Sequence, residues 1–139
     1  MMSRSLSPKR FSSTLKAFNT PLAPPPAASY SQAMKVNNLI YVSGQIPMTP
    51  DNKPVQGDIK AKAEQVISNI NEILKESNSS LHHIVKVNIF LTDMANFADF
   101  NSVYAKYFSE HKPARSCVAV KELPLGMDLE VEVVAVEKD

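Results

Sequence analysis

The sequence predicts an α+β fold in which two helices pack on one face of a mixed β-sheet. Several segments alternate apolar and polar residues, as half-buried strands do, and two others repeat apolar residues at helical spacing. In chain order we expect two strands, a short extended segment, a helix, a strand, a helix and two final strands. The 139 residues are enough for one domain with a buried core.

The first two strands form a predicted hairpin. Residues 33–36 and 39–43 carry the strand pattern, and Asn37 and Asn38 separate them as a two-residue turn. Asparagine tolerates the left-handed backbone conformation that such a turn requires. A surface loop with several prolines follows, and we expect the short extended segment around residues 55–56.

Two helices enclose a buried strand in the middle of the chain. Residues 58–77 place apolar side chains three and four apart, and Asp58 is the predicted N-cap. Residues 84–91 have the pattern of a buried strand, with these side chains on the inner face: Val85, Val87, Ile89 and Leu91. Asp93 is the predicted cap of a second helix that extends to Glu110. Its aromatic stripe is expected in the core, and consists of Phe97, Phe100, Tyr104 and Phe108.

The last two strands carry the candidate chemistry. In residues 113–120, alternation puts Arg115 and Cys117 on one face, and in residues 129–133 Glu130 and Glu132 share a face. If the two strands contribute to one pocket, it offers a planar cation and an acid. Such a pair suits a small carboxylate substrate that must also exchange a proton or water. A cross-strand ion pair is the alternative, and the spacing alone leaves both open.

These segments resemble the RidA (YjgF) family of reactive-intermediate deaminases over residues 22–139. Several separated motifs in one order carry the resemblance more specifically than one short pattern can. The matching motifs are Ser29-Tyr30-Ser31-Gln32-Ala33, Val42-Ser43-Gly44-Gln45-Ile46-Pro47, Ile84-Val85-Lys86-Val87, Phe100-Asn101-Ser102-Val103-Tyr104, the arginine segment 113–120, and Leu129-Glu130-Val131-Glu132. Many relatives have Gly-Pro before the tyrosine, where this chain has Ala28-Ser29.

The resemblance implies a chorismate-mutase-like fold assembled as a homotrimer, with three clefts between subunits. It also implies hydrolysis of 2-aminoacrylate and 2-aminocrotonate, through their imines, to 2-oxo acids and ammonia, which protects pyridoxal-phosphate enzymes. Neither a cofactor nor a metal is expected. The implied cleft residues are Tyr30, Ser43, Gly44, Asn101, Arg115, Cys117 and Glu130. The alternative is a trimeric module that binds 2-oxo acids without catalysis or acts like a chaperone.

Residue chemistry suggests a role for each catalytic candidate. Arg115 can grip a carboxylate through two parallel hydrogen bonds, and Glu130 can hold a water and accept its proton. Tyr30 can cap the substrate from a neighbouring subunit, and the Ser43 hydroxyl can bond the substrate or water. Cys117 is either a nucleophile or a packing residue. No histidine or helix N-terminus stands beside it in sequence to favour a thiolate.

The N-terminus resembles a mitochondrial transit peptide for the matrix. Residues 1–20 contain four basic residues, several serines and no acid, and Arg10 lies two residues before a candidate cut after Phe11. A disordered basic tail is the alternative. We therefore expect a targeting segment at 1–20, a proline-rich linker at 21–29 and the domain at 30–139.

Charge and composition limit the kinds of partner that the protein is expected to bind. The net charge of +1 becomes −3 when the four basic residues of the targeting segment are subtracted, which argues against general nucleic-acid binding. No apolar run approaches the length of a membrane span, so we expect a soluble protein. The single cysteine excludes an internal disulfide.

Overall fold

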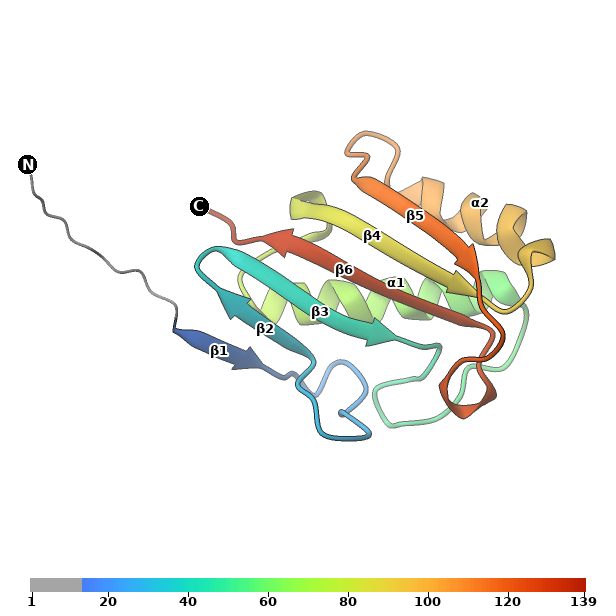
Figure 1. Cartoon of the computed structure of the whole chain (residues 1–139), viewed down its shortest axis with the longest axis horizontal. Helices are drawn as coiled ribbons and strands as arrows, with labels where there is room; N and C mark the ends of the chain where they lie inside the picture. Colours follow the sequence, from blue (N-terminus) through green and yellow to red (C-terminus); the bar gives the residue numbers. More distant parts are fainter. Residues whose placement is uncertain (1–13) are drawn as a thin grey trace, which may run out of the picture.

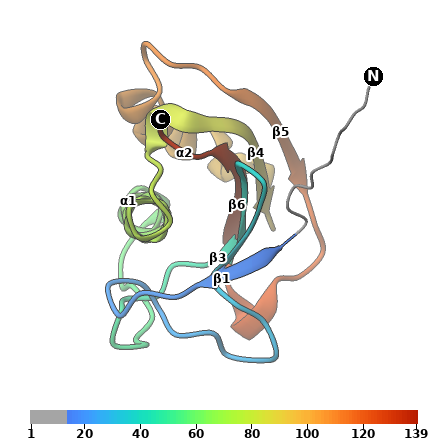
Figure 2. The ribbon, with the colours of Figure 1, turned by 90° about the vertical axis from the view of Figure 1, so that its left-hand side faces the viewer.

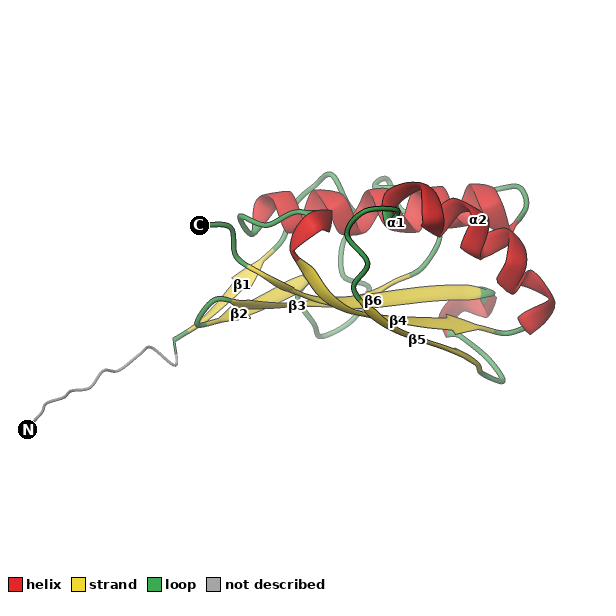
Figure 3. Cartoon of the chain, turned by 90° about the horizontal axis from the view of Figure 1, so that it is seen from above, coloured by secondary structure: helices red, strands yellow, loops and turns green. Residues whose placement is uncertain are grey.

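The protein is described by a computed structural model that covers residues 14–139. Six strands form one sheet in the order β1-β2-β3-β6-β4-β5, and α1 and α2 cover one of its faces (Figures 1 and 3). Only the β4–β5 pair is parallel, so the sheet is mixed. The elements are β1 (Leu15–Phe18), β2 (Ala33–Val36), β3 (Leu39–Gln45), α1 (Ile59–Glu76), β4 (Ile84–Leu91), α2 (Phe97–Tyr107), β5 (Ala114–Ala119) and β6 (Leu129–Val136). The predicted α+β class is confirmed.

The hairpin and the first helix follow the sequence patterns closely. Val36 pairs with Leu39 across the turn, and Asn37 has the left-handed φ of 55° that the turn needs. In α1, the Asp58 side chain accepts a hydrogen bond from the backbone N–H of Ala61, as an N-cap does. The segment around residues 55–56 does not form a named strand. A single bridge between Met48 and Pro54 closes that loop instead.

The second helix is shorter than predicted. Asp93 accepts a hydrogen bond from the Ala95 N–H and therefore caps a 3₁₀ turn, Met94–Asn96, that leads into α2. The helix ends at Tyr107 instead of Glu110, because Phe108 leaves the helical conformation at φ −124° and ψ 48°. The aromatic stripe lies in the core, as predicted.

A bulge in β4 overturns one predicted side-chain orientation. The register with β6 shifts between Ile84 and Lys86, so Ile84 is buried and Val85 is 47% exposed. An extra residue in a strand interrupts the alternation of faces at that point. After the bulge, Val87, Ile89 and Leu91 point into the core as predicted.

The other face of the sheet is left uncovered by helices in the part of the chain that the structure describes (Figures 2 and 3). In β6, Leu129, Val131, Val133 and Ala135 are buried beneath the helices, while Glu130 and Glu132 alternate with them on the opposite face. We call this opposite side the open face. It exposes the side chains of Tyr41 and Val118.

The folded part of the chain begins earlier than predicted. β1 pairs with β2 from Leu15 to Phe18, inside the segment assigned to targeting. The Thr20 N–H donates to buried Gln32 Oε1 at 2.7 Å, and Gln32 Nε2 donates to the Pro24 carbonyl at 2.8 Å. The proline-rich segment therefore packs on the domain and does not merely link to it. The rest of the predicted targeting segment, with its candidate cut, lies outside the described residues.

Candidate functional site

A pocket of about 550 Å³ opens on the open face, where β3 ends beside the loop between β5 and β6. We call it the open-face pocket. Four of the seven predicted cleft residues line it, namely Tyr30, Ser43, Gly44 and Glu130. Its remaining lining residues are Ala27, Ala28, Ile46, Pro124, Leu125 and Glu132. Segments far apart in the sequence thus meet here in a single protomer.

A second bulge shapes this pocket. The register of β3 with β6 shifts between Val42 and Gln45, so Ser43 and Gly44 together occupy the place of one ladder residue. The carboxylate of Glu130 uses the space that the glycine leaves free. A Cβ built on Gly44 would lie 1.8 Å from Glu130 Oε2, which no real contact allows. Gly44 is therefore the residue that lets the acid lie against the strand.

The environment of Glu130 favours its protonated form. Burial raises the pKa of Glu130, and the like charge of Glu132 raises it further. Glu132 itself accepts a hydrogen bond from Asn88 Nδ2 at 3.1 Å. A carboxyl whose pKa is moved toward neutrality is better suited to take up and return a proton than an ordinary surface glutamate.

Tyr30 and Ser43 are tied to the loop that borders the pocket. The Tyr30 hydroxyl accepts a hydrogen bond from the Ala27 N–H at 3.2 Å, and the Ser43 hydroxyl donates to the Ser31 carbonyl at 2.7 Å. Because that bond uses its proton, the Ser43 hydroxyl is left with lone pairs to accept a bond from a ligand. Tyr30 lies in the same pocket as Glu130 of its own chain.

The other three predicted residues gather at the β5 edge of the sheet, beside α2. Arg115 Nη1 donates to Asn101 Oδ1 at 2.7 Å, and the guanidinium carbon lies 4.7 Å from the centre of the Tyr104 ring and 5.6 Å from that of Phe97. We call this group the arginine edge. Stacking on two rings and one hydrogen bond hold the guanidinium in place while leaving other N–H groups to bind an anion.

Phe97 and Tyr104 were predicted only as core residues. Their contact with Arg115 is the part of the site that sequence reasoning missed. A signal was present, because Phe97, Asn101 and Tyr104 are four and then three residues apart and so share a helix face. Cys117 also lies at this edge, packed against the core, and burial raises the pKa of its thiol while Arg115 opposes the shift. This favours the packing role.

Within one protomer, the open-face pocket and the arginine edge lie on opposite faces of the sheet. Arg115 is in register with Val87, and Val87 with Val133, and both valines are buried beneath the helices. Glu130, by contrast, is in register with Phe90 and sits on the open face. Within a single chain, the arginine and glutamate strands therefore do not contribute to one pocket. β4 lies between them.

The same geometry excludes the ion-pair alternative for Arg115. Its strand is separated from that of Glu130 by β4, and among residues 14–139 the ion pairs all involve lysine. The guanidinium is thus stacked and hydrogen-bonded, but no carboxylate in the described part of the chain neutralises it.

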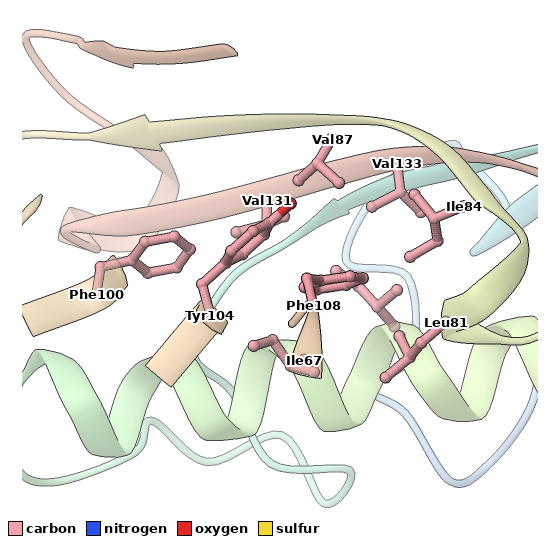
Figure 4. Close-up of a pocket in the computed structure, with 10 residues that line it drawn as sticks. Ile67, Leu81, Ile84, Val87, Phe100, Tyr104, Phe108, Val131 and Val133 are labelled. Atoms are coloured by element: carbon pink, nitrogen blue, oxygen red, sulfur yellow. The ribbon is translucent and has the colours of Figure 1, made fainter. Parts of the chain in front are cut away.

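A separate apolar cavity lies between the helices and the sheet (Figure 4). Phe100 and Tyr104 of α2, and Phe108 directly after it, face Val87 and Val131 of the sheet across the cavity. Its volume of about 10 Å³ is at the lower limit for a single water molecule. It is a packing defect of the core and too small for a substrate.

The described residues provide neither a metal site nor a membrane-spanning helix. Over the described stretch, no three histidine, cysteine or acidic side chains stand close enough together to hold a metal ion. No helix in residues 14–139 is long and apolar enough to cross a membrane.

Known proteins resemble this chain along most of its length. Mmf1, a mitochondrial protein of Saccharomyces cerevisiae, is 70% identical over 131 residues, which cover 94% of this chain and 90% of Mmf1. The crystal structure of yeast Mmf1 superposes with a TM-score of 0.89 at 72% identity, covering 90% of this chain and 100% of that one.

Two bacterial structures are also similar. RidA from the Antarctic bacterium Psychrobacter sp. is 40% identical with a TM-score of 0.84, and the match covers 87% of this chain and 98% of RidA. TdcF from E. coli with bound serine is 34% identical with a TM-score of 0.83, over 88% of this chain and 99% of TdcF.

The family profile described as Endoribonuclease L-PSP matches residues 20–137. This match starts near the end of β1 and continues into the C-terminal segment beyond β6. It includes the open-face pocket and the arginine edge, and agrees with the motifs found in the sequence. The chain belongs to this family, the RidA (YjgF) family.

Proposed function

We propose that this protein hydrolyses reactive 2-imino acids, formed from the enamines 2-aminoacrylate and 2-aminocrotonate, to 2-oxo acids and ammonia. The proposal rests mainly on the surroundings of the Arg115 guanidinium. It is a fixed, planar cation with no carboxylate partner among residues 14–139, and such a cation is suited to recognise a carboxylate substrate. The serine bound to TdcF supports the choice, because serine is also a small carboxylate with nitrogen on its second carbon.

The complete site forms between subunits of a homotrimer. Arg115 and Glu130 occupy opposite faces, so only two chains can bring them to one substrate. The open face exposes apolar side chains that association would cover. A closed ring of identical subunits supplies each site with an arginine edge from one chain and an open-face pocket from the next.

The reaction needs only positioning and proton transfer. Arg115 binds the substrate carboxylate through two hydrogen bonds and fixes the plane of the imine. Glu130 takes one proton from a water while its oxygen adds to the imine carbon. The protonated Glu130 then returns that proton to the nitrogen of the adduct. Glu130 next accepts the proton of the adduct's hydroxyl group and passes it to the same nitrogen as the C–N bond breaks, so that ammonia leaves and a 2-oxo acid remains. These proton steps benefit from the raised pKa of Glu130.

The setting we propose is the mitochondrial matrix, where removal of these compounds protects pyridoxal-phosphate enzymes from attack. The acid-free basic N-terminus supports this location, and Mmf1 is named as a mitochondrial protein.

The decisive test generates the enamine in place with a serine or threonine dehydratase and follows 2-oxo acid and ammonia with and without this protein. We expect faster release with the protein at equal dehydratase activity. Unchanged release, together with measurable binding of a 2-oxo acid, would instead indicate a binding module.

A further inference from the structure

Leu125 is an unusual residue at the rim of the open-face pocket. It belongs to the turn Pro124–Gly126, has φ 59° and ψ 24°, and is 68% exposed. Leucine avoids the left-handed region, where glycine and asparagine are the usual residues, and gains nothing from exposure to water. Residues with strained backbones cluster at functional sites, and Leu125 lies beside one.

Leu125 lies at the border between two pockets. It lines the open-face pocket together with Glu130, and it also lines a smaller adjoining pocket together with Tyr30 and Gly44. Ile46 lines both pockets as well. Leu125 therefore lies on the side of the open-face pocket toward which a ligand bound at Glu130 would extend into the smaller pocket.

The pocket is divided by polarity. Its strand residues, Ser43, Glu130 and Glu132, are polar, whereas loop residues such as Ala27, Ile46 and Leu125 are apolar. A 2-imino acid is divided in the same way. One substituent on its reacting carbon is a carboxylate, and the other is an alkyl group that makes no hydrogen bond.

We propose that Leu125, backed by Ile46, is the wall that receives the substrate's alkyl group and makes the enzyme favour longer apolar 2-imino acids. This rests on the proposed function, because the carboxylate must point to Arg115 of a neighbouring subunit. Each methylene buried against this wall improves binding by about 4-fold, and up to about 10-fold where the fit is close. 2-Iminobutanoate is thus a better substrate than 2-iminopropanoate.

The test compares substrates of different length. An amino acid oxidase generates the imines of alanine, 2-aminobutanoate and norvaline, and kcat/KM is measured for the intact protein and three variants. Leu125→Asn keeps a residue that tolerates the left-handed turn but removes the apolar wall. Leu125→Met keeps the wall apolar. Leu22→Asn is the matched control, since Leu22 is 59% exposed and lines neither pocket.

We expect Leu125→Asn to lower the ratio of kcat/KM for 2-iminobutanoate to that for 2-iminopropanoate by about 4-fold or more, because the shorter substrate has less alkyl surface to lose from the wall. Leu125→Met and Leu22→Asn should keep the ratio of the unaltered protein. An unchanged ratio in Leu125→Asn, or an equal loss on both substrates, overturns the role of Leu125.

Binding of pyruvate and 2-oxobutanoate, measured by calorimetry, separates this inference from the proposed function. Should the unaltered protein show no turnover, the deaminase proposal fails. A preference for 2-oxobutanoate that Leu125→Asn removes would still support the wall, whereas equal affinity for both acids in the unaltered protein would refute it.

Discussion

The carboxylate of Glu130 occupies the space where any residue but glycine at position 44 would place its Cβ, with 1.8 Å between that Cβ and Glu130 Oε2. The fit ties the position of the acid to the bulge in β3. It also makes the contribution of Gly44 measurable, because one methyl group is enough to displace the acid.

Gly44→Ala should therefore lower kcat/KM by about 10²-fold, since a displacement of this size misplaces the catalytic group. Thermal unfolding should change little, because the displaced atoms are at the free end of a side chain. The control is the same change in a Glu130→Gln background. If Gly44 acts through Glu130, the added loss there is small, and a full second loss in the double variant contradicts the account.

Arg115→Lys should lose most of the activity although it keeps the positive charge. An ammonium cannot form two parallel bonds to a carboxylate and cannot stack on the rings of Phe97 and Tyr104 as a guanidinium does. Steady-state kinetics should show a raised KM and a lowered kcat. Near-normal rates in the lysine variant would mean that Arg115 provides only an electric field.

Mixed assemblies of two inactive variants test the shared site. In trimers reassembled from equal amounts of Arg115→Ala and Glu130→Gln chains, about a quarter of the sites pair an intact arginine edge with an intact open-face pocket. We expect about a quarter of the original activity, measured after joint refolding and compared with each variant refolded alone. No recovery, in mixed trimers confirmed by light scattering and mass spectrometry, would show that each site lies within one chain.

The pH dependence of kcat/KM should report Glu130. Its ionised form accepts the proton of water, so the rate falls as the pH drops through its pKa, which burial and Glu132 hold above the ordinary 4.5. Glu132→Gln removes the like charge, favours ionisation of Glu130 and should move the acid limb to lower pH. Glu76→Gln, on the exposed end of α1, should leave the limb in place. If Glu132→Gln leaves the acid side of the pH profile of kcat/KM in place, Glu130 is not the titrating group.

The fold also constrains removal of the N-terminus. We expect residues 1–20 to carry a fused reporter into mitochondria and the natural chain to be cut before β1, as a cut after Phe11 allows. Mass spectrometry of the mature protein locates the cut. A cytosolic reporter with an intact N-terminus would contradict the targeting.

A truncation series adds a stability measurement to this prediction. A chain that begins at residue 21 lacks β1 and the Thr20–Gln32 hydrogen bond, so its melting temperature should fall by about 5 °C or more relative to one that begins at residue 12. Equal melting temperatures would show that β1 adds nothing to the domain.

Local patterns were enough to predict the elements whose side chains repeat regularly. α1, with its Asp58 cap, and the alternation of β6 depend on neighbours in sequence, and both were predicted correctly. The exposure of Val85 was missed because a bulge depends on how β4 pairs with β6. β1 was missed because four residues are too few for a pattern, and basic neighbours suggested another role.

The arrangement of the site exceeded what sequence could predict. Alternation correctly put Arg115 with Cys117 and Glu130 with Glu132 on shared faces. Whether those faces coincide depends on the strand order and on registers such as Arg115 with Val87, which are set by tertiary pairing. The residue types were therefore predictable, but the division of the site between two faces was not.

The last strand of the chain is the middle of the sheet, since β6 lies between β3 and β4. Neither half of the sheet can close its core before the C-terminus is available, so folding must wait for contacts between distant parts of the chain. During translation, we expect the polypeptide to stay unfolded until its final residues leave the ribosome. A premature stop before Leu129 should consequently yield a product without a folded domain, and not one that has merely lost its glutamate.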